Sequence, residues 1–204
     1  MAPVKVDPDH VHAFADAGAF YTWLGRHHDK EPEVWIRIYK VRSGTPSITP
    51  KEAIDIALCW GWIDAIRKGL DEVSFLQRYT PRGRKSVWSQ INVDNVARLV
   101  AEGRMTEHGL KQVEAAKADG RWEQAYRVKG ATVPADLRAA IDAVPEAKAM
   151  FETLTAQNRF ALIFRTGAMK SEAGRRKKIA GFVDMLRRGE TVHPQGPPAV
   201  GRQT

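Results

Sequence analysis

The chain has 204 residues, of which 43% are hydrophobic and 27% charged, with one cysteine and a formal net charge of +8. A chain of this length buries roughly 70% of its unfolded surface, enough for one domain or two small ones, and it lacks the run of about 18 apolar residues that a membrane helix needs. The N-terminus has no apolar secretory stretch and Cys59 has no disulfide partner in the chain, so we expect a cytoplasmic protein without a membrane span.

The first predicted elements are a lead-in, a helix and a strand. We expect residues 1–15 to be a flexible lead-in and residues 16–28 to form a helix with one apolar face. Residues 33–41 alternate with a period of two, which predicts a strand. The next helix has a strong start signal, with Thr49 as the cap, proline at the first helical position and Glu52 three residues after the cap.

After Gly61 the hydrophobic period changes to two in residues 62–68 and 72–79, which predicts an antiparallel hairpin. Together with the preceding strand, this hairpin predicts a sheet of about three strands. A basic loop follows, and two further helices are predicted between Asn92 and Gly120. We therefore expect an α+β domain over residues 16–126.

The C-terminal part is predicted to be helical throughout. Residues 127–133 are expected to be a linker, and the apolar spacing that follows predicts four helices in a domain over residues 134–190. Residues 191–204 are rich in proline and glycine, and we expect a disordered tail there. The predicted fold class is therefore α+β, with a small antiparallel sheet of about three strands packed with helices, followed by an all-helical C-terminal region.

The positive charge is concentrated in two segments. Residues 73–93 hold four basic and no acidic side chains, and residues 156–189 hold nine basic and two acidic ones. A basic patch attracts phosphates, nucleic acids or acidic surfaces. Because the second segment lies on helices whose other face is apolar, we interpret it as a solvated surface and expect the functional charges in the first segment.

Common catalytic and cofactor motifs are absent from the sequence. It contains no GxxxxGK[ST] or GxGxxG loop, no HExxH, no GxSxG and no paired CxxC. The histidine pairs His10-x-His12 and His27-His28 have no clear third metal ligand, so we predict neither a metal nor a cofactor. We interpret Cys59, beside Trp60, as a small core residue rather than a nucleophile.

The densest group of chemically active side chains lies between residues 59 and 95. Asp64 is placed on the apolar face of a predicted strand, where a carboxylate needs a partner, and Arg78 on the adjacent strand is the candidate. Such a pair is equally compatible with a structural ion pair and with a ligand site. Arg82 precedes a helix N-terminus, where main-chain N–H groups favour an anion. The candidate ligand-binding residues are Trp62, Asp64, Arg78, Tyr79, Arg82, Trp88 and Asn92.

Five short motifs are distributed along the chain: CWGWID at 59–64, RYTPR at 78–82, SVWSQIN at 86–92, AMKSE at 168–172 and RRKKI at 175–179. Their combination resembles the bacterial YdeI/OmpD-associated family, also called bacteriocin-protection proteins. The resemblance implies a link to resistance against antimicrobial peptides, bacteriocins or stress, and it implies no particular reaction. The family name also implies association with an outer-membrane porin, but a periplasmic partner requires export and this sequence shows no export signal, so we expect no such association.

Three functions remain open from the sequence. The preferred one is a cytoplasmic protein that binds a small anionic ligand between the hairpin and the helix near Asn92, with aromatic walls and arginines that neutralise the charge. The second is an enzyme that uses Asp64 as a general acid or base, for which no second catalytic group stands out. The third is a nucleic-acid-binding module that uses the basic loop and the C-terminal basic helices.

Overall fold

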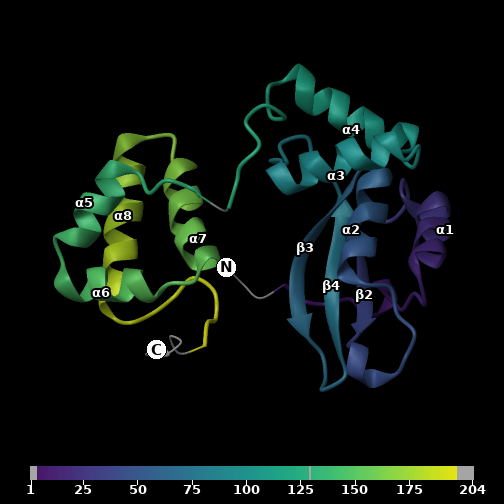
Figure 1. Ribbon diagram of the computed structural model, residues 1–204, viewed down its shortest axis with the longest axis horizontal. Coiled ribbons are helices and arrows are strands. Elements are labelled where there is room, and N and C mark those ends of the chain that lie inside the picture. Colours follow the sequence, from purple (N-terminus) through teal and green to yellow (C-terminus); the bar gives the residue numbers. More distant parts are fainter. Residues whose placement is uncertain (1–3, 129, 197–204) are drawn as a thin grey trace, which may run out of the picture. The chain divides into compact units, whose positions relative to one another are not determined.

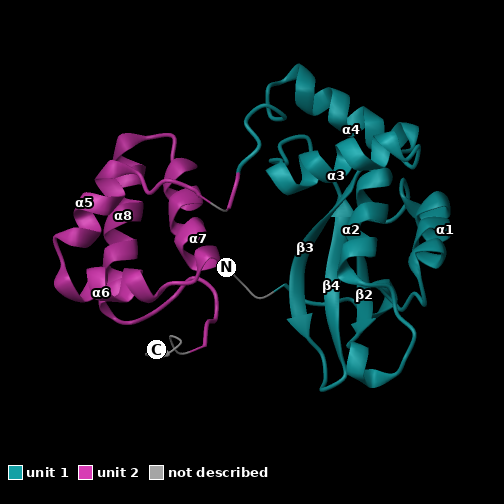
Figure 2. Ribbon diagram, viewed as in Figure 1, with its two compact units in different colours: residues 1–126 teal, residues 127–204 magenta. Residues whose placement is uncertain are grey.

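The computed structural model describes residues 4–128 and 130–196, and the chain divides into two compact units (Figure 2). Unit 1 spans residues 1–126 and combines a sheet with helices, whereas unit 2 spans residues 127–204 and is helical. The predicted α+β class with a helical C-terminal region is confirmed. None of the helices in the described part of the chain is long and apolar enough to cross a membrane.

Unit 1 is built on a four-stranded mixed sheet in the order β1-β2-β4-β3 (Figure 1). β3 and β4 form the predicted antiparallel hairpin, and β2 pairs antiparallel with β4. The strands span Val11–His12 (β1), Val34–Tyr39 (β2), Trp62–Gly69 (β3) and Ser74–Pro81 (β4).

The short strand β1 corrects the expected sheet of about three antiparallel strands. Val11 and His12 pair in parallel with Trp35 and Ile36 of β2. They lie in the segment expected to be a flexible lead-in, and Phe14 just beyond them is buried in the core. Two residues are too few to show a hydrophobic period, so this strand is defined by its long-range pairing alone.

Two helices and the sheet enclose the first core of unit 1. Phe20 and Leu24 of α1 (Ala17–His27) are fully buried with the apolar residues of β2. α2 (Pro50–Cys59) begins with the predicted capping box, in which Thr49 Oγ1 accepts from the Glu52 N–H and Glu52 Oε2 accepts from the Thr49 N–H. Because these contacts join residues three apart, the sequence was sufficient to predict where this helix begins.

A second core lies under α3 (Gln90–Ala101) and α4 (Glu107–Ala118). Thr106 caps α4 by accepting from the Gly109 N–H, and its hydroxyl donates to Cys59 O at the end of α2 with an oxygen–oxygen distance of 2.6 Å. One threonine therefore starts one helix and ties it to the end of another.

Unit 2 has a hydrophobic core of its own. Its helices are α5 (Ala135–Asp142), α6 (Pro145–Thr153), α7 (Ala156–Gly167) and α8 (Glu172–Arg187), and their buried residues form one cluster. Four helices are present in the described part of this unit, as the sequence predicts. Residue 129 of the expected linker lies outside the described residues.

The segment after α8 differs from the expected disordered tail as far as it is described. Asn158 Nδ2 donates to His193 O at 3.0 Å and to Gln195 Oε1 at 2.8 Å, and the His193 N–H donates to Asn158 Oδ1. Residues 191–196 are therefore joined to α7 by hydrogen bonds that no local pattern reveals. Residues 197–204 of the expected tail lie outside the described residues.

Candidate anion-binding site

Asp64 lies beside buried aromatic side chains on the helix-covered face of the sheet. It is directly opposite Tyr79 in the β3–β4 pairing, and directly opposite residues point to the same face. Tyr79 is 0% exposed and shares a core with Trp62 and Phe20. The alternation along β3 therefore places this carboxylate at the edge of an apolar core.

Arg78 lies on the other face of the sheet. Its side chain forms an ion pair with Glu33, and its guanidinium carbon is 6.0 Å from the centroid of a Trp35 ring. Because successive residues of a strand point to opposite faces, Arg78 and its neighbour Tyr79 diverge. The expected pairing of Arg78 with Asp64 is therefore wrong.

Arg82 follows the last residue of β4 and turns into the interior. Its N–H donates to Gly61 O at 3.0 Å, and its guanidinium carbon lies 3.5 Å from the centroid of the Trp88 ring. The side chain is only 6% exposed, and Nη1 donates to Val87 O at 3.3 Å. Nε and Nη2 are buried and have no hydrogen-bond partner within the described residues. Arg82 is thus a buried cation with unmet donors.

Two further buried polar atoms are unmet, one on the residue opposite Asp64 and one on the ring that Arg82 covers. Tyr79 OH and Trp88 Nε1 also have no hydrogen-bond partner in the described part of the chain. Asp64 interacts with Arg82 through its charge, but no ion pair joins the two among residues 4–128. Asp64, Tyr79, Arg82 and Trp88, hereafter the Arg82 cluster, therefore combine one carboxylate with several donors that have no acceptor.

Burial changes the acidity of the charged groups in the Arg82 cluster. Burial lowers the pKa of Arg82 to about 10, against the opposing effect of the Asp64 charge. Burial raises the pKa of Asp64 above its ordinary value, although the positive charge of Arg82 acts in the opposite direction. The burial effect outweighs the attraction in both groups, so the pair is not a stabilising salt bridge.

A segment that the sequence did not single out covers this cluster. The Tyr126 N–H donates to Trp88 O at 3.0 Å, the Gln90 N–H donates to Tyr126 O at 2.8 Å, and Arg121 Nη1 donates to Ser86 O at 2.8 Å. Residues 121–126 therefore run along the loop that carries Trp88. The aromatic pair Trp122 and Tyr126 in a polar stretch is the one sequence signal that points to such a contact.

The remaining predicted site residues lie outside the Arg82 cluster. Trp62 Nε1 donates to His28 O at 3.2 Å, which holds this ring in the core. Asn92 lies in the first turn of α3, where its N–H donates to the Ser89 cap rather than facing open space. Of the seven candidates, Asp64 lies opposite Tyr79 and interacts with Arg82 through its charge, and Arg82 lies on the ring of Trp88. Arg78 is the candidate that the structure places on the other face of the sheet.

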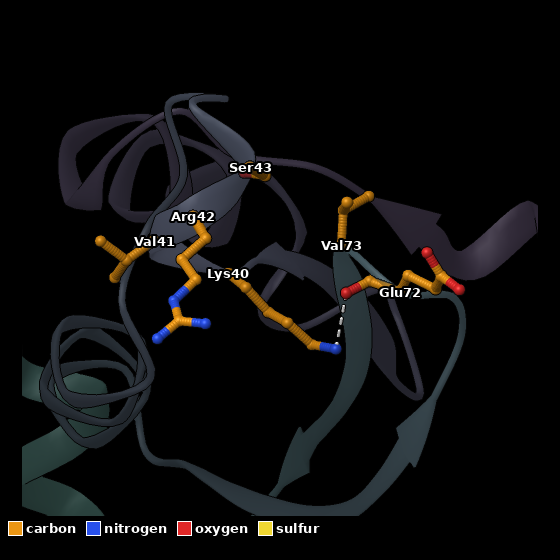
Figure 3. A pocket seen from close by; sticks show the side chains of 6 residues that line it. All are labelled: Lys40, Val41, Arg42, Ser43, Glu72 and Val73. Carbon is orange, nitrogen blue, oxygen red and sulfur yellow. Dashed lines mark hydrogen bonds between the residues drawn. The ribbon is translucent and has the colours of Figure 1, made fainter.

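A separate hollow of about 490 Å³ lies at the other end of the hairpin, where β2 ends and β4 begins (Figure 3). Its basic side chains are exposed, and Lys40 Nζ donates to Glu72 O at 2.8 Å. None of the unmet buried atoms found in the described residues belongs to this hollow. The Arg82 cluster is therefore the stronger candidate for a ligand site.

Comparison with known families gives one match within each of the two units. Residues 12–112 match the model of a domain of unknown function (DUF8412), and residues 130–189 match the model described as bacteriocin-protection, YdeI or OmpD-associated. No curated protein matches the chain, and no solved structure matches it.

The two matches refine the family resemblance. The motifs at 168–172 and 175–179 lie within the bacteriocin-protection match, whereas the motifs CWGWID, RYTPR and SVWSQIN lie within the other. The family relationship is thus supported for unit 2, and the Arg82 cluster belongs to a domain whose description assigns no activity. The chain is similar to the bacteriocin-protection, YdeI or OmpD-associated family over residues 130–189 and to the DUF8412 domain over residues 12–112.

Proposed function

We propose that unit 1 binds a small anion through Arg82. The observation that carries this proposal is the buried guanidinium whose Nε and Nη2 have no acceptor in the described residues. These two nitrogens lie on one edge of the guanidinium and can donate to two oxygens of a single carboxylate or phosphate. An unmet buried donor costs about 1–3 kcal/mol, so an anion that accepts from this edge relieves a destabilising arrangement.

The other members of the Arg82 cluster would orient the ligand. Trp88 Nε1 and Tyr79 OH supply further donors, and the partly exposed Asp64 can accept from a hydroxyl or amino group of the same ligand. The Trp88 ring under the guanidinium supplies an apolar wall. This combination favours a small organic anion that also carries a hydrogen-bond donor.

Access to these donors requires a local movement. The unmet atoms of Arg82, Tyr79 and Trp88 have almost no solvent-accessible surface, so no water-sized space adjoins them. The loop that carries Trp88 is held by hydrogen bonds to residues 121–126. We infer that the anion enters when residues 121–126 separate from this loop, while Asp64 marks the exposed side of the site.

The test is a titration of the full chain with phosphate, acetate and hydroxy acids, followed by calorimetry and tryptophan fluorescence. We expect saturable binding that Arg82→Met weakens at least about tenfold, or about 1.4 kcal/mol, because the methionine keeps the packing on Trp88 and removes the donor edge. Arg84→Met is the matched control, since Arg84 is exposed in the same loop. Equal binding by wild type and Arg82→Met contradicts the proposal.

The thermal stability of the same variants separates binding from structure. Arg82→Met removes a buried cation with unmet donors, so we expect the Tm of the ligand-free chain to stay the same or rise. A lower Tm together with unchanged anion binding would assign Arg82 a structural role.

A second candidate function is supported by the surroundings of Asp64. Burial raises its pKa while its side chain stays partly exposed beside Arg82, which is the environment of a general acid or base acting on a bound anion. The match of unit 2 to the bacteriocin-protection, YdeI or OmpD-associated model supports a link between either activity and bacteriocin protection.

A further inference from the structure

Unit 2 carries an apolar groove along one side of α8. The groove has a volume of about 520 Å³ and is lined by Met169, Gly174, Lys177, Lys178, Gly181, Phe182 and Met185. Six of these residues belong to α8, at offsets of 0, 3, 4, 7, 8 and 11 from Gly174, so they follow one face of the helix. Met169, just before α8, closes the end of this face.

The groove is lined by apolar side chains and by a glycine that has no side chain. Met169, Phe182 and Met185 supply the apolar surface, and methionine side chains adapt readily to a partner. Gly181 lies in the middle of α8, and a Cβ built there would meet nothing within 4 Å. A glycine inside a helix costs about 1 kcal/mol relative to alanine. At Gly181 its effect is to leave the helix backbone open to close approach.

The charges around the groove are distributed unevenly. Four arginines of α8 and its end are paired with carboxylates: Arg175 with Asp136, Arg176 with Glu172, and Arg187 and Arg188 with Asp184. Lys177 and Lys178, which border the groove, have no carboxylate partner among residues 130–196. Within α8, Lys177 and Lys178 are therefore the cations without a carboxylate partner in the described residues, and Lys178 Nζ lies 5.9 Å from the centroid of the Phe182 ring.

We propose that this groove binds an amphipathic helix of a partner protein. The helix would place a large apolar side chain over Phe182 and Met185 and acidic side chains beside Lys177 and Lys178. Gly174 and Gly181 are two helical turns apart, which allows a second helix to lie close along α8. A lipid surface or a nucleic acid would be attracted by the lysines, but neither accounts for the apolar lining or for the open backbone at Gly181. The groove lies in unit 2, so the inference is independent of anion binding by unit 1.

The chemistry of the partner can be determined by selecting helical peptides from a display library for binding to the full chain. The peptides carry fixed leucines in an i, i+3, i+4, i+7 pattern, and the flanking positions vary among Glu, Gln and Lys. We expect enrichment of Glu at the flanks, and methyl NMR shifts at Met169 and Met185 but not at Met105 when a selected peptide binds. Enrichment of Lys, shifts confined to other methionines, or no binding peptide at all would overturn the proposal.

Two pairs of variants locate the contact. A Cβ at Gly181 meets nothing within 4 Å, so Gly181→Leu adds a side chain in the groove and favours the helix. We expect an unchanged or higher Tm and at least about tenfold weaker peptide binding, or about 1.4 kcal/mol. Gly167→Leu is the matched control, because Gly167 is also open and lies outside the groove. Lys178→Glu should reverse the preference for Glu flanks, whereas Lys148→Glu on α6 should not.

The same variants distinguish the other occupants. Phosphatidylglycerol vesicles and a DNA duplex are titrated in parallel with the selected peptide. Tighter binding to either than to the peptide, with no effect of Gly181→Leu, would overturn the helix-binding proposal and assign the lysines to a lipid or nucleic-acid surface.

Discussion

Arg78 and Arg82 lie four residues apart and have opposite environments. Arg78 is paired with Glu33 on the open face of the sheet, whereas Arg82 is buried with two nitrogens that have no acceptor in the described chain. Buried charges are ordinarily paired, and exceptions concentrate at binding and catalytic sites. This contrast between two arginines of one motif supports a ligand site at Arg82 alone.

The pH dependence of Asp64 follows from its burial. The raised pKa means that, between its ordinary value and the raised one, the folded chain binds more protons than the unfolded chain, so the contribution of Asp64 to stability falls as pH rises through this window. Asp64→Asn should therefore raise the free energy of unfolding at neutral pH, with the gain disappearing below the ordinary range of a carboxyl group. Urea unfolding at several pH values measures this difference.

The same substitution should strengthen the binding of acetate, an anion that has no donor for Asp64. Asp64→Asn removes a negative charge near Arg82, so the affinity of wild type for an anion should likewise rise as Asp64 is protonated at lower pH. Asp29→Asn, an exposed change of equal charge, is the control. Weaker binding of acetate by Asp64→Asn would contradict this account, whereas a hydroxy acid, whose hydroxyl donates to Asp64, should gain less affinity than acetate or lose affinity.

At the scale of elements, the close approach of α4 to α2 depends on Gly109, which has no side chain. A Cβ at Gly109 would lie 2.3 Å from Cys59 O and 2.7 Å from Leu58 O, both main-chain atoms that cannot rotate away. Gly109→Ala should therefore lower the free energy of unfolding by about 2–3 kcal/mol, as overpacking does. Gly69→Ala, where nothing lies within 4 Å, should change it little. Equal unfolding midpoints in urea would contradict this account.

Elements with local signals were predicted well, and elements without them were not. The caps Thr49, Thr106 and Ser171 contact residues three positions away, so helix starts could be predicted from short windows. β1 exists because Val11 pairs with Trp35, a contact between distant residues. Segment 121–126 also depends on contacts between residues that are distant in the sequence. The sequence therefore predicted the surroundings of Arg82 only in part.

For the whole molecule, the two units have separate hydrophobic cores. Two clusters of buried residues belong to unit 1 and one cluster to unit 2, and none of the three contains residues of both units. We therefore expect residues 1–126 and 127–204, expressed separately, to reproduce the amide NMR spectra of the corresponding parts of the full chain. Loss of dispersed peaks in either fragment would show that the units need each other to fold.

The basic side chains of unit 2 differ in whether a carboxylate neutralises them. In unit 2 the arginines of α8 are held in ion pairs, whereas Lys177 and Lys178 have no carboxylate partner in the described residues. A nucleic-acid-binding protein loses affinity steeply as salt is added. The nucleic-acid hypothesis therefore stays a prediction to be tested by that salt dependence.

Local patterns in the sequence were enough for the α+β class, the hairpin and the capped start of α2. They could not decide which polar groups meet, because Asp64, Arg78 and Arg82 differ only in strand register and in the turn that follows β4. Pairing across the sheet sends Arg78 to Glu33 and leaves Arg82 buried on Trp88 without an acceptor. The net positive charge of the sequence does not by itself identify a site. Burial of the unpaired Arg82 destabilises the fold, whereas exposed arginines change its stability little, so the tertiary structure singles out Arg82.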